Sequence, residues 1–405
     1  MNRLALSVSR GIARVTESPL GPYQSAVIRI GFSATWVLFL LREFPHRQEL
    51  YGPDGPWSWA LARQLTSENE AFTALLWSDG QFWFEVCYLL AVVSGVLLLL
   101  GWRSRTSSLL FMVGVLSMQN RSVFMGDGGD NVLHLMSIYL VFTRCGRVWS
   151  LDARRAARGE AARARGEWVH DRVGPVLWTG FGLVLGAVTL AGRFGGGWLV
   201  PALLWTVWAA LGLWWLAGRF AAAGEFRILL DVIANIVHNG ALFVIMAEAC
   251  LIYATAGWYK IQGSRWQDGT AVYYPLHLDS FSPWPALADL LSANGTVVML
   301  VTYGTVIMQV AFPFTLFNRR VKNVLLAAMM TEHAAIAVVL GLPFFSLAMI
   351  AADAVFLPTS FLRRLGGRVA RARLVRPRGS GGGTARAIEP EPEREPEPAV
   401  GVRQP

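Results

Sequence analysis

The chain has 405 residues, of which 54% are hydrophobic and only 16% are charged, and its mean hydropathy is +0.42. Soluble domains carry about 25% charged residues, so this composition excludes an ordinary soluble protein. The apolar residues form continuous runs near the ~20 residues that a membrane-spanning helix requires, whereas the strands of a membrane β-barrel alternate apolar and polar positions. The sequence therefore predicts an all-α fold, a polytopic bundle of transmembrane helices.

The formal net charge of +9 does not indicate a nucleic-acid partner, because the arginines gather in the segments between apolar runs. In such segments arginine sets the membrane topology and meets anionic lipid, so we expect membrane lipids and no nucleic acid as partners. Cys87, Cys145 and Cys250 lie far apart and indicate neither a disulfide framework nor a metal site. Residues 1–20 lack the compact apolar core of a cleavable signal peptide.

Nine to ten membrane spans are predicted along the chain, with short interfacial helices at 42–80 and 283–291. The apolar runs cover residues 24–41, 81–101, 107–124, 132–142, 173–192, 197–217, 228–257, 295–317, 324–342 and 343–361. The third and fourth runs are short, which leaves a re-entrant pair open at that place.

The predicted organisation has three parts. Residues 1–22 form a cytoplasmic leader, 23–362 form the membrane domain, and 363–405 form a disordered tail that is first basic and then rich in Glu and Pro. The membrane domain divides into a first block (23–143), an Arg-rich cytoplasmic connector (144–172) and a second block (173–362). The positive-inside rule then places both termini in the cytoplasm and a loop containing Lys260 on the outer face of the cell membrane.

The stretch from Tyr253 to Tyr274 contains Lys260, which is the only lysine besides Lys322. It lies close to Trp258 and Trp266, in a segment between two apolar runs. A lysine that loses its proton near neutral pH acts as a general base, so Lys260 is the candidate catalytic residue. The alternative is an interfacial anchor, in which the lysine reaches the head groups beside a belt of aromatic rings.

Several polar residues lie within or beside the apolar runs, where ionisable groups are costly and usually face a bundle interior or a cavity. The candidates for such a cavity or substrate site are Arg29, Asn120, Arg121, Asp130, Asn131, His134, Asn235, His238, Trp266 and His333. Their number favours one shared cavity that suits a charged or quinone-like head group. The alternative for each is a hydrogen bond or ion pair between helices, such as one between Arg29 and Asp130. The spacings match no zinc motif, so no metal is expected.

Two motifs resemble those of a known family. The sequence AGWYKIQGSRWQDGTAVYY (Ala256–Tyr274) resembles the signature of the horizontally transferred transmembrane (HTTM) domain, which vitamin K-dependent gamma-carboxylase shares with bacterial membrane proteins. A second stretch, His333 to Pro358, resembles the carboxylase pattern of a His in a span followed by Gly-x-Pro and another span. A third and weaker likeness covers NRSVFMGDGGD (Asn120–Asp130), where Arg121 replaces the family's His. The similarity extends over about residues 22–362.

The resemblance implies that Lys260 corresponds to the carboxylase base, which takes a proton from vitamin K hydroquinone. A quinone or hydroquinone is therefore the cofactor to consider, although the residues themselves leave the cofactor unknown. Arg121 stays protonated and does not replace a neutral His as a base. By size, the chain looks closer to the sporulation-delaying-protein B-like branch of the family, whose members help to mature a secreted peptide.

Three functions remain open from the sequence. The first is a membrane enzyme that uses Lys260 in a quinol-linked reaction on a lipid or a secreted peptide. The second is a non-catalytic membrane component for maturation, export or immunity of a secreted peptide. The third is a transporter or lipid-binding protein whose polar cavity is its site.

Overall fold

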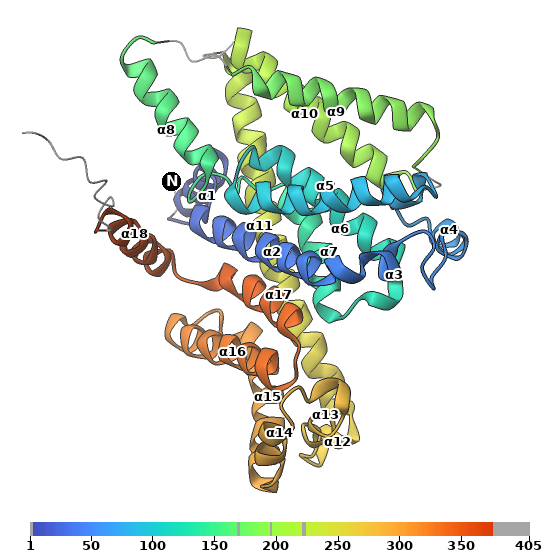
Figure 1. The fold of residues 1–405 in the computed structure, drawn as a ribbon. Coiled ribbons are helices and arrows are strands. Elements are labelled where there is room, and N and C mark those ends of the chain that lie inside the picture. The colour runs from blue at the N-terminus through green and yellow to red at the C-terminus, as the bar shows by residue number, and fades with distance from the viewer. Residues whose placement is uncertain (1–2, 168–170, 195–196, 221–223, 376–405) are drawn as a thin grey trace, which may run out of the picture. The chain divides into compact units, whose positions relative to one another are not determined.

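The computed structural model describes residues 3–167, 171–194, 197–220 and 224–375, and these residues form helices and no strands (Figure 1). The α-helices are α1 (Arg3–Glu17), α2 (Pro22–Glu43), α3 (Arg47–Tyr51), α4 (Trp59–Glu68), α5 (Gln81–Leu100), α6 (Ser104–Arg121), α7 (Gly128–Val141), α8 (Leu151–Ala164), α9 (Val173–Leu190), α10 (Leu199–Phe220), α11 (Glu225–Gln262), α12 (Ser264–Gln267), α13 (Tyr273–Leu276), α14 (Pro285–Ser292), α15 (Gly295–Thr315), α16 (Arg319–Val339), α17 (Pro343–Asp353) and α18 (Thr359–Val375). Five short 3₁₀ helices connect them: η1 (Phe44–His46), η2 (Ala74–Trp77), η3 (Val123–Met125), η4 (Asp279–Phe281) and η5 (Ala354–Phe356).

Short polar side chains begin several of these helices. The Ser150 hydroxyl accepts from the N–H of Ala153 at the start of α8, and Asn294 and Asn318 do the same at α15 and α16. Asp127 and Asp130 form a reciprocal capping box at the start of α7. Each cap satisfies N–H groups that have no partner inside the helix. The turn chemistry between the apolar runs therefore fixes where the helices start.

Helix α2 packs between α5 and α17, as Figure 1 shows. Small residues bring the backbones together: a Cβ added at Gly31 would lie 2.5 Å from the Cβ of Ala351 on α17. One added at Gly95 on α5 would lie 2.7 Å from Val37. Lipid tails are as apolar as leucine, so helices in a bilayer gain most from such close packing. This contact holds α17, and with it Asp353, against the first block.

Seven helices are long and apolar enough to cross a membrane among the described residues, or eight if the bent pair 343–356 and 359–369 counts as one span. They belong to α2 with its extension to Tyr51, α5, α9, α10, α11, α15 and α16. This is compatible with an integral membrane protein, but the nine to ten spans expected from the sequence are not confirmed. Much of the shortfall comes from the third and fourth runs, because α7 has only 14 residues and α6 carries many polar ones.

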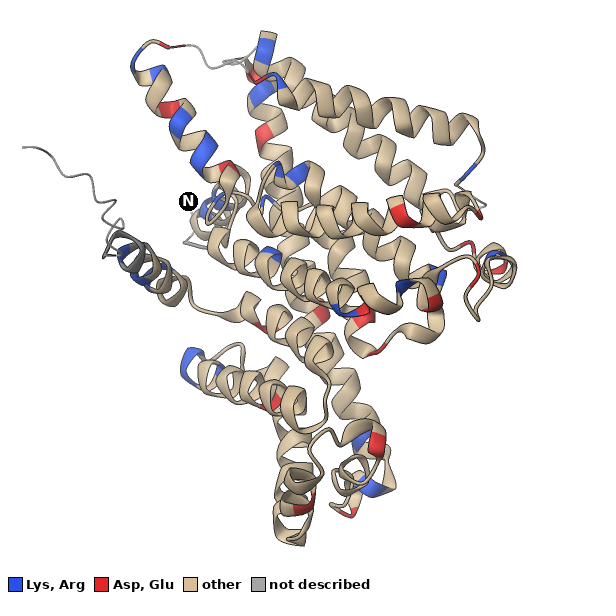
Figure 2. Ribbon diagram, in the orientation of Figure 1, with Lys and Arg blue, Asp and Glu red and all other residues tan. Residues whose placement is uncertain are grey.

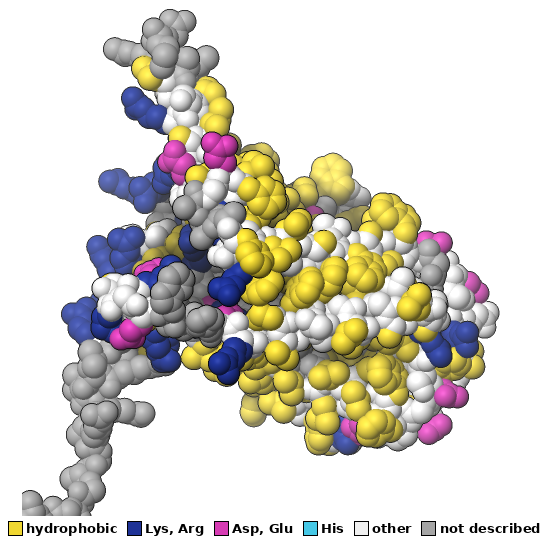
Figure 3. All heavy atoms as spheres, turned by 90° about the horizontal axis from the view of Figure 1, so that it is seen from above, with side chains coloured by type: hydrophobic (Ala, Val, Ile, Leu, Met, Phe, Trp, Pro, Cys, Tyr) yellow, Lys and Arg dark blue, Asp and Glu magenta, His cyan; other side chains and the backbone are white. Residues whose placement is uncertain are grey.

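The outer surfaces of α9 and α10 are apolar and exposed. Val176, Leu183 and Leu190 each expose more than half of their surface. The space-filling view in Figure 3 shows hydrophobic side chains over the middle of one face, with basic side chains at one end. The two helices are joined to each other by Trp178 and Trp208, whose rings stack at 4.5 Å and whose indole N–H groups each donate to the other's carbonyl. An exposed apolar surface of this kind suits contact with lipid.

The chain divides into two compact units, residues 1–363 and 364–405. Residues 363–375 belong to helix α18, whereas the sequence analysis assigned them to the disordered tail. Arg, Ala and Leu dominate this segment and are good helix formers. The Glu/Pro-rich part of the predicted tail lies outside the described residues.

An ion pair joins the start of α6 to the residues before α9. The Arg103 guanidinium donates to both carboxylate oxygens of Asp171, whose side chain is 47% exposed. These bonds lower the pKa of Asp171 from its ordinary value of 3.8 to about 2. The charged carboxylate is thus favoured in the folded state.

Asp171→Asn is expected to lower the free energy of unfolding at pH 7 by up to about 1 kcal/mol, the usual range for a half-exposed pair. Because the folded pKa lies below the unfolded one, the wild-type advantage is present above about pH 4 and is lost as the pH falls to about 2. Thermal unfolding of both proteins between pH 7 and pH 2 measures this. A difference that persisted at pH 2 would contradict the assignment.

Candidate functional site

Lys260 lies in the last turn of α11 and not in the loop that the sequence suggested. Its Nζ donates to Oε1 of Gln309 on α15 at 2.6 Å, and it lies 5.2 Å from the ring centre of Trp266. Gly257, one turn earlier, permits this contact, since a Cβ there would lie 2.6 Å from Cγ2 of Val310. A larger residue at 257 would push the two helices apart. The glycine of the AGWYK motif therefore brings the lysine to its glutamine partner.

Gln309 connects the amine to a carboxylate. Its Nε2 donates to Oε1 of Glu332 on α16 at 3.3 Å, while its Oε1 accepts from Lys260. The Gln309 side chain is buried, with 5% of its surface exposed. One amide thus uses both of its polar atoms to link a base and an acid from two other helices.

A second polar group lies beside the first and is more deeply buried. The Tyr253 hydroxyl, on α11, donates to Oδ1 of Asp353 on α17 at 2.9 Å. It also lies 3.1 Å from Nε2 of His333 on α16. These three side chains expose 2% of their surface or less. Phe312 and Phe345 pack edge-on against Tyr253 and His333 respectively.

The hydrogen-bond directions in this group assign the histidine tautomer. With Tyr253 donating its only proton to Asp353, we assign the proton of His333 to Nε2, which then donates to the phenol oxygen. The other ring nitrogen, Nδ1, is then an acceptor. Nδ1 of His333 and Oδ2 of Asp353 are both buried and have no hydrogen-bond partner among the described residues. Unpaired buried acceptors are costly, so they are suited to receive protons from a bound group.

The two groups form one cluster. Glu332 and His333 are neighbours on α16, and Tyr253 precedes Lys260 by two turns on the same face of α11. Four helices, α11, α15, α16 and α17, therefore supply the six side chains of what we call the Lys260 cluster: Tyr253, Lys260, Gln309, Glu332, His333 and Asp353. The types present are those of proton-transfer sites: an amine, a phenol, an imidazole and two carboxyl groups.

Arg29 does not belong to this cluster and does not pair with Asp130. It is fully buried, and its guanidinium donates to the backbone carbonyls of Leu98, Leu99, Cys145 and Trp149 at 2.5 to 3.2 Å. Two of these carbonyls end α5, where a positive charge is favoured by the helix dipole. Backbone acceptors thus replace the carboxylate partner that the sequence suggested.

Asn235 and His238 are also separate from Lys260. They lie nearer the other end of α11 and hold the last turn of α1 and the residues that follow it. Asn235 donates to the Thr16 carbonyl at 2.8 Å, and Nε2 of His238 lies 2.8 Å from the Leu20 carbonyl. Their other atoms accept from Arg144. Their role in the structure is to join segments.

The residues around the Gly-rich turn line a separate pocket of about 480 Å³. Asn120, Asp130, Asn131 and His134 contribute to it, together with Gln119, whose Oε1 lies 3.0 Å from Nδ1 of His134. The Asp130 carboxylate also accepts from the backbone N–H of Asp127 in the capping box at the start of α7.

Arg121 is buried beneath this region and donates to the carbonyls of Gly52 and Trp57 at 2.7 and 2.9 Å. Of the predicted cavity residues, only Trp266 and His333 accompany Lys260. Asn120, Asp130, Asn131 and His134 share the second pocket instead, whereas Arg29, Arg121, Asn235 and His238 line neither site.

Sequence reasoning missed Gln309 and Tyr253 as members of the site. Tyr253 had a usable signal, because a spacing of seven residues places it on the Lys260 face of a helix. Gln309 is the only carboxamide in its apolar run, which is the kind of residue that marks a buried contact. Asp353 is an ionisable group in the last apolar run, but its partner Tyr253 could not be inferred from spacing.

No family profile, no curated protein and no solved structure matches this chain. The likeness to the HTTM domain consequently stays a prediction that rests on the motifs around Lys260 and His333.

Proposed function

We propose that this protein is a membrane enzyme in which Lys260 acts as a general base on a lipid-soluble substrate with an acidic hydroxyl group, such as a hydroquinone. The single observation that carries the proposal is the convergence of six acid–base and amide side chains from four apolar helices. Ionisable groups at such depth are expensive, and they mark proton or substrate pathways in membrane proteins.

The contacts of Lys260 suit a base. Its hydrogen-bond partner is the neutral amide of Gln309 and not a carboxylate. An amide oxygen accepts an N–H from either the amine or the ammonium, so it does not hold Lys260 in the charged form as an ion pair would. A lysine in such surroundings changes protonation state readily. The neutral Nζ then has a lone pair with which to take a proton from a hydroxyl.

Glu332 is connected to the amine through Gln309, and it is the natural group to stabilise the ammonium after proton transfer. Tyr253, His333 and Asp353 hold one another in fixed positions, which leaves Nδ1 of His333 and Oδ2 of Asp353 as acceptors. Both atoms are of the kind that accepts a hydrogen bond from a hydroxyl group. A bound hydroquinone would lose two protons and two electrons to become the quinone, and dioxygen would be the electron acceptor.

The proposal is tested with the full chain in lipid nanodiscs. Hydroquinone binding is measured by native mass spectrometry, and its aerobic oxidation is followed by quinone absorbance, for wild type, Lys260→Met and Lys322→Met. Lys322 is the matched control, because it is the only other lysine and its Nζ donates to the Phe356 carbonyl and not to a member of the Lys260 cluster.

We expect Lys260→Met to lower the oxidation rate by about 10²- to 10⁴-fold, the usual contribution of a general base. Lys322→Met should retain the wild-type rate. The proposal fails if wild type does not bind hydroquinone, or if the two variants lose activity to the same extent.

A further inference from the structure

A second hollow lies among the arginines, away from the Lys260 cluster. It has a volume of about 770 Å³ and is bounded by the turn between α5 and α6, by α8, and by α9 and α10. Figure 2 shows basic residues along α8 and at the start of α11. One part of the lining is apolar and includes Trp178, Phe181 and Leu211. The hollow, which we call the arginine groove, therefore combines a charged wall with an apolar wall.

The arginine groove has an excess of positive charge. Five arginines line it against three carboxylates, Asp152, Glu160 and Asp171, so two positive charges are in excess. The arginines are Arg103, Arg105, Arg144, Arg147 and Arg155. Arg103 and Arg155 pair with lining carboxylates, and Arg144 pairs with Asp231 behind the groove. Arg105 and Arg147 form no ion pair with any described residue.

Three guanidinium groups surround one indole ring. Arg105 and Arg227 each lie 4.3 Å from the ring centre of Trp214, and Arg144 lies 5.2 Å from it. Arg144 and Arg227 share the single carboxylate of Asp231, at 3.1 Å each. Three like charges held together with one counter-charge repel one another, and an added anion would relieve this.

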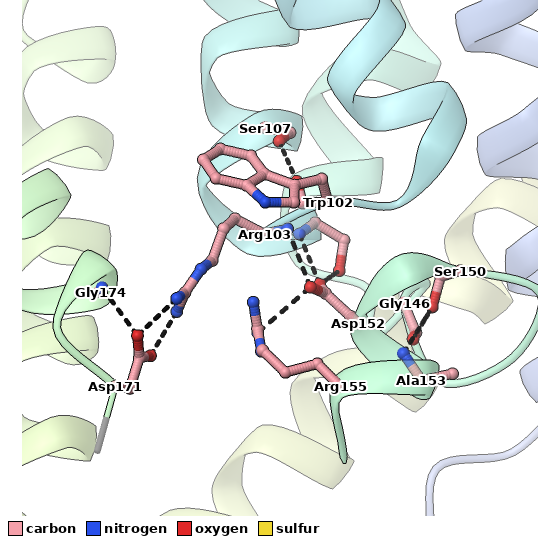
Figure 4. Close-up of polar contacts among 11 residues, drawn as sticks. Trp102, Arg103, Ser107, Gly146, Ser150, Asp152, Ala153, Arg155, Asp171 and Gly174 are labelled. Atoms are coloured by element: carbon pink, nitrogen blue, oxygen red, sulfur yellow. Dashed lines mark hydrogen bonds and ion pairs between the residues drawn. The ribbon is translucent and has the colours of Figure 1, made fainter. Parts of the chain in front are cut away.

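The carboxylate of Asp152 is largely committed to the backbone. Its Oδ1 accepts from the N–H of Arg103 at 2.8 Å, and its Oδ2 accepts from the N–H and hydroxyl of Ser104 at 2.7 and 2.6 Å (Figure 4). These bonds fix Arg103 in the left-handed region at a φ of 47°, which is uncommon for a residue with a side chain. Strain of this kind persists where the surroundings impose it, often at binding sites. Asp152 therefore builds the wall of the groove and neutralises only part of its charge.

We propose that the arginine groove binds the phosphate head group of an acidic phospholipid, with its acyl chains against the apolar wall. Guanidinium groups match phosphate oxygens in geometry, and Arg105 and Arg147 have no competing carboxylate. Free phosphate shares the charged part of this chemistry but gains nothing from Trp178, Phe181 and Leu211. The groove also opens beside α9 and α10, whose exposed apolar surfaces suit lipid tails.

The test uses the full chain in a neutral detergent, with dioleoyl phosphatidylglycerol, dioleoyl phosphatidylcholine and inorganic phosphate as separate probes. Binding is followed by native mass spectrometry and by the rise in Tm. Phosphatidylglycerol should bind saturably at least tenfold more tightly than phosphatidylcholine, and its affinity should fall as salt is added. Equal binding of the two lipids overturns the proposal, and saturation by inorganic phosphate at the same concentration overturns its lipid part.

The double variant Arg105→Gln/Arg147→Gln should weaken phosphatidylglycerol binding at least tenfold. The matched control is Arg154→Gln/Arg158→Gln, which removes the same charge from exposed positions of α8 outside the groove and should leave the affinity unchanged. If the first double variant does not fold, Arg155→Gln provides a second measurement at the groove edge, and it should reduce affinity by a smaller factor. Equal affinity in all variants overturns the proposal.

Discussion

Replacing Arg29 by Leu is expected to prevent stable folding. The guanidinium is fully buried and donates to four carbonyls that come from the end of α5 and from the loop before α8. A hydrogen bond to a charged group contributes about 1.5–3 kcal/mol, and a carbonyl left buried without a partner costs about 1–3 kcal/mol. Even with partial rearrangement, the loss should exceed about 4 kcal/mol, which is a large share of the stability of a typical protein.

The measurement is the yield of monodisperse protein after extraction into detergent, together with its denaturation midpoint. Arg29→Lys should recover only a part of the wild-type yield and denaturation midpoint, because a single ammonium does not reach all the carbonyls that surround the guanidinium. Arg158→Leu, on the exposed side of α8, is the control and should behave as wild type. Wild-type yield and midpoint for Arg29→Leu would show that the buried network is dispensable.

The second large effect is expected at Lys260, where Arg should fail as completely as Met. Arginine keeps the positive charge and the ability to donate to Gln309, but it is always protonated and cannot take a proton from a hydroxyl. Hydroquinone oxidation by Lys260→Arg should therefore fall about 10²- to 10⁴-fold, while binding measured by native mass spectrometry changes much less. This pattern separates a base from a membrane anchor or a positioning cation.

An anchor or a positioning cation predicts the opposite result. In both cases Arg replaces Lys with little loss, and only Met is defective. The comparison also needs Gln309→Leu, which removes the amide between Lys260 and Glu332 and should slow oxidation less than loss of the amine does. Activity in Lys260→Arg close to that of wild type would contradict the role of a base.

The sequence predicted the helical class and most helix positions well, because the signal is the length of apolar runs. The run at 228–257 lies inside α11, and the run at 295–317 nearly coincides with α15. The prediction of membrane spans was less accurate where polar residues interrupt an apolar run, as in α6. Ser, Gln, Asn and Arg lower the hydropathy of a segment without preventing a helix.

The candidate site could be predicted only in part. Lys260 stood out by rarity, and His333 by its position in an apolar run. The partners of Arg29 could not be foreseen, because backbone carbonyls become acceptors only when a helix ends and a loop folds over it. The three-arginine arrangement around Trp214 was missed for a similar reason: its members come from α6, α10, α11 and the residues before α8.

The Arg29 network also has a consequence for biogenesis. Arg29 is synthesised 120 residues before Trp149, the most distant of its acceptors. At a translation rate of about 5–20 residues per second, roughly 6–24 seconds pass before that acceptor exists. During this interval the guanidinium of α2 lacks part of its acceptors, so we expect this helix to remain beside the insertion machinery until the later segments arrive.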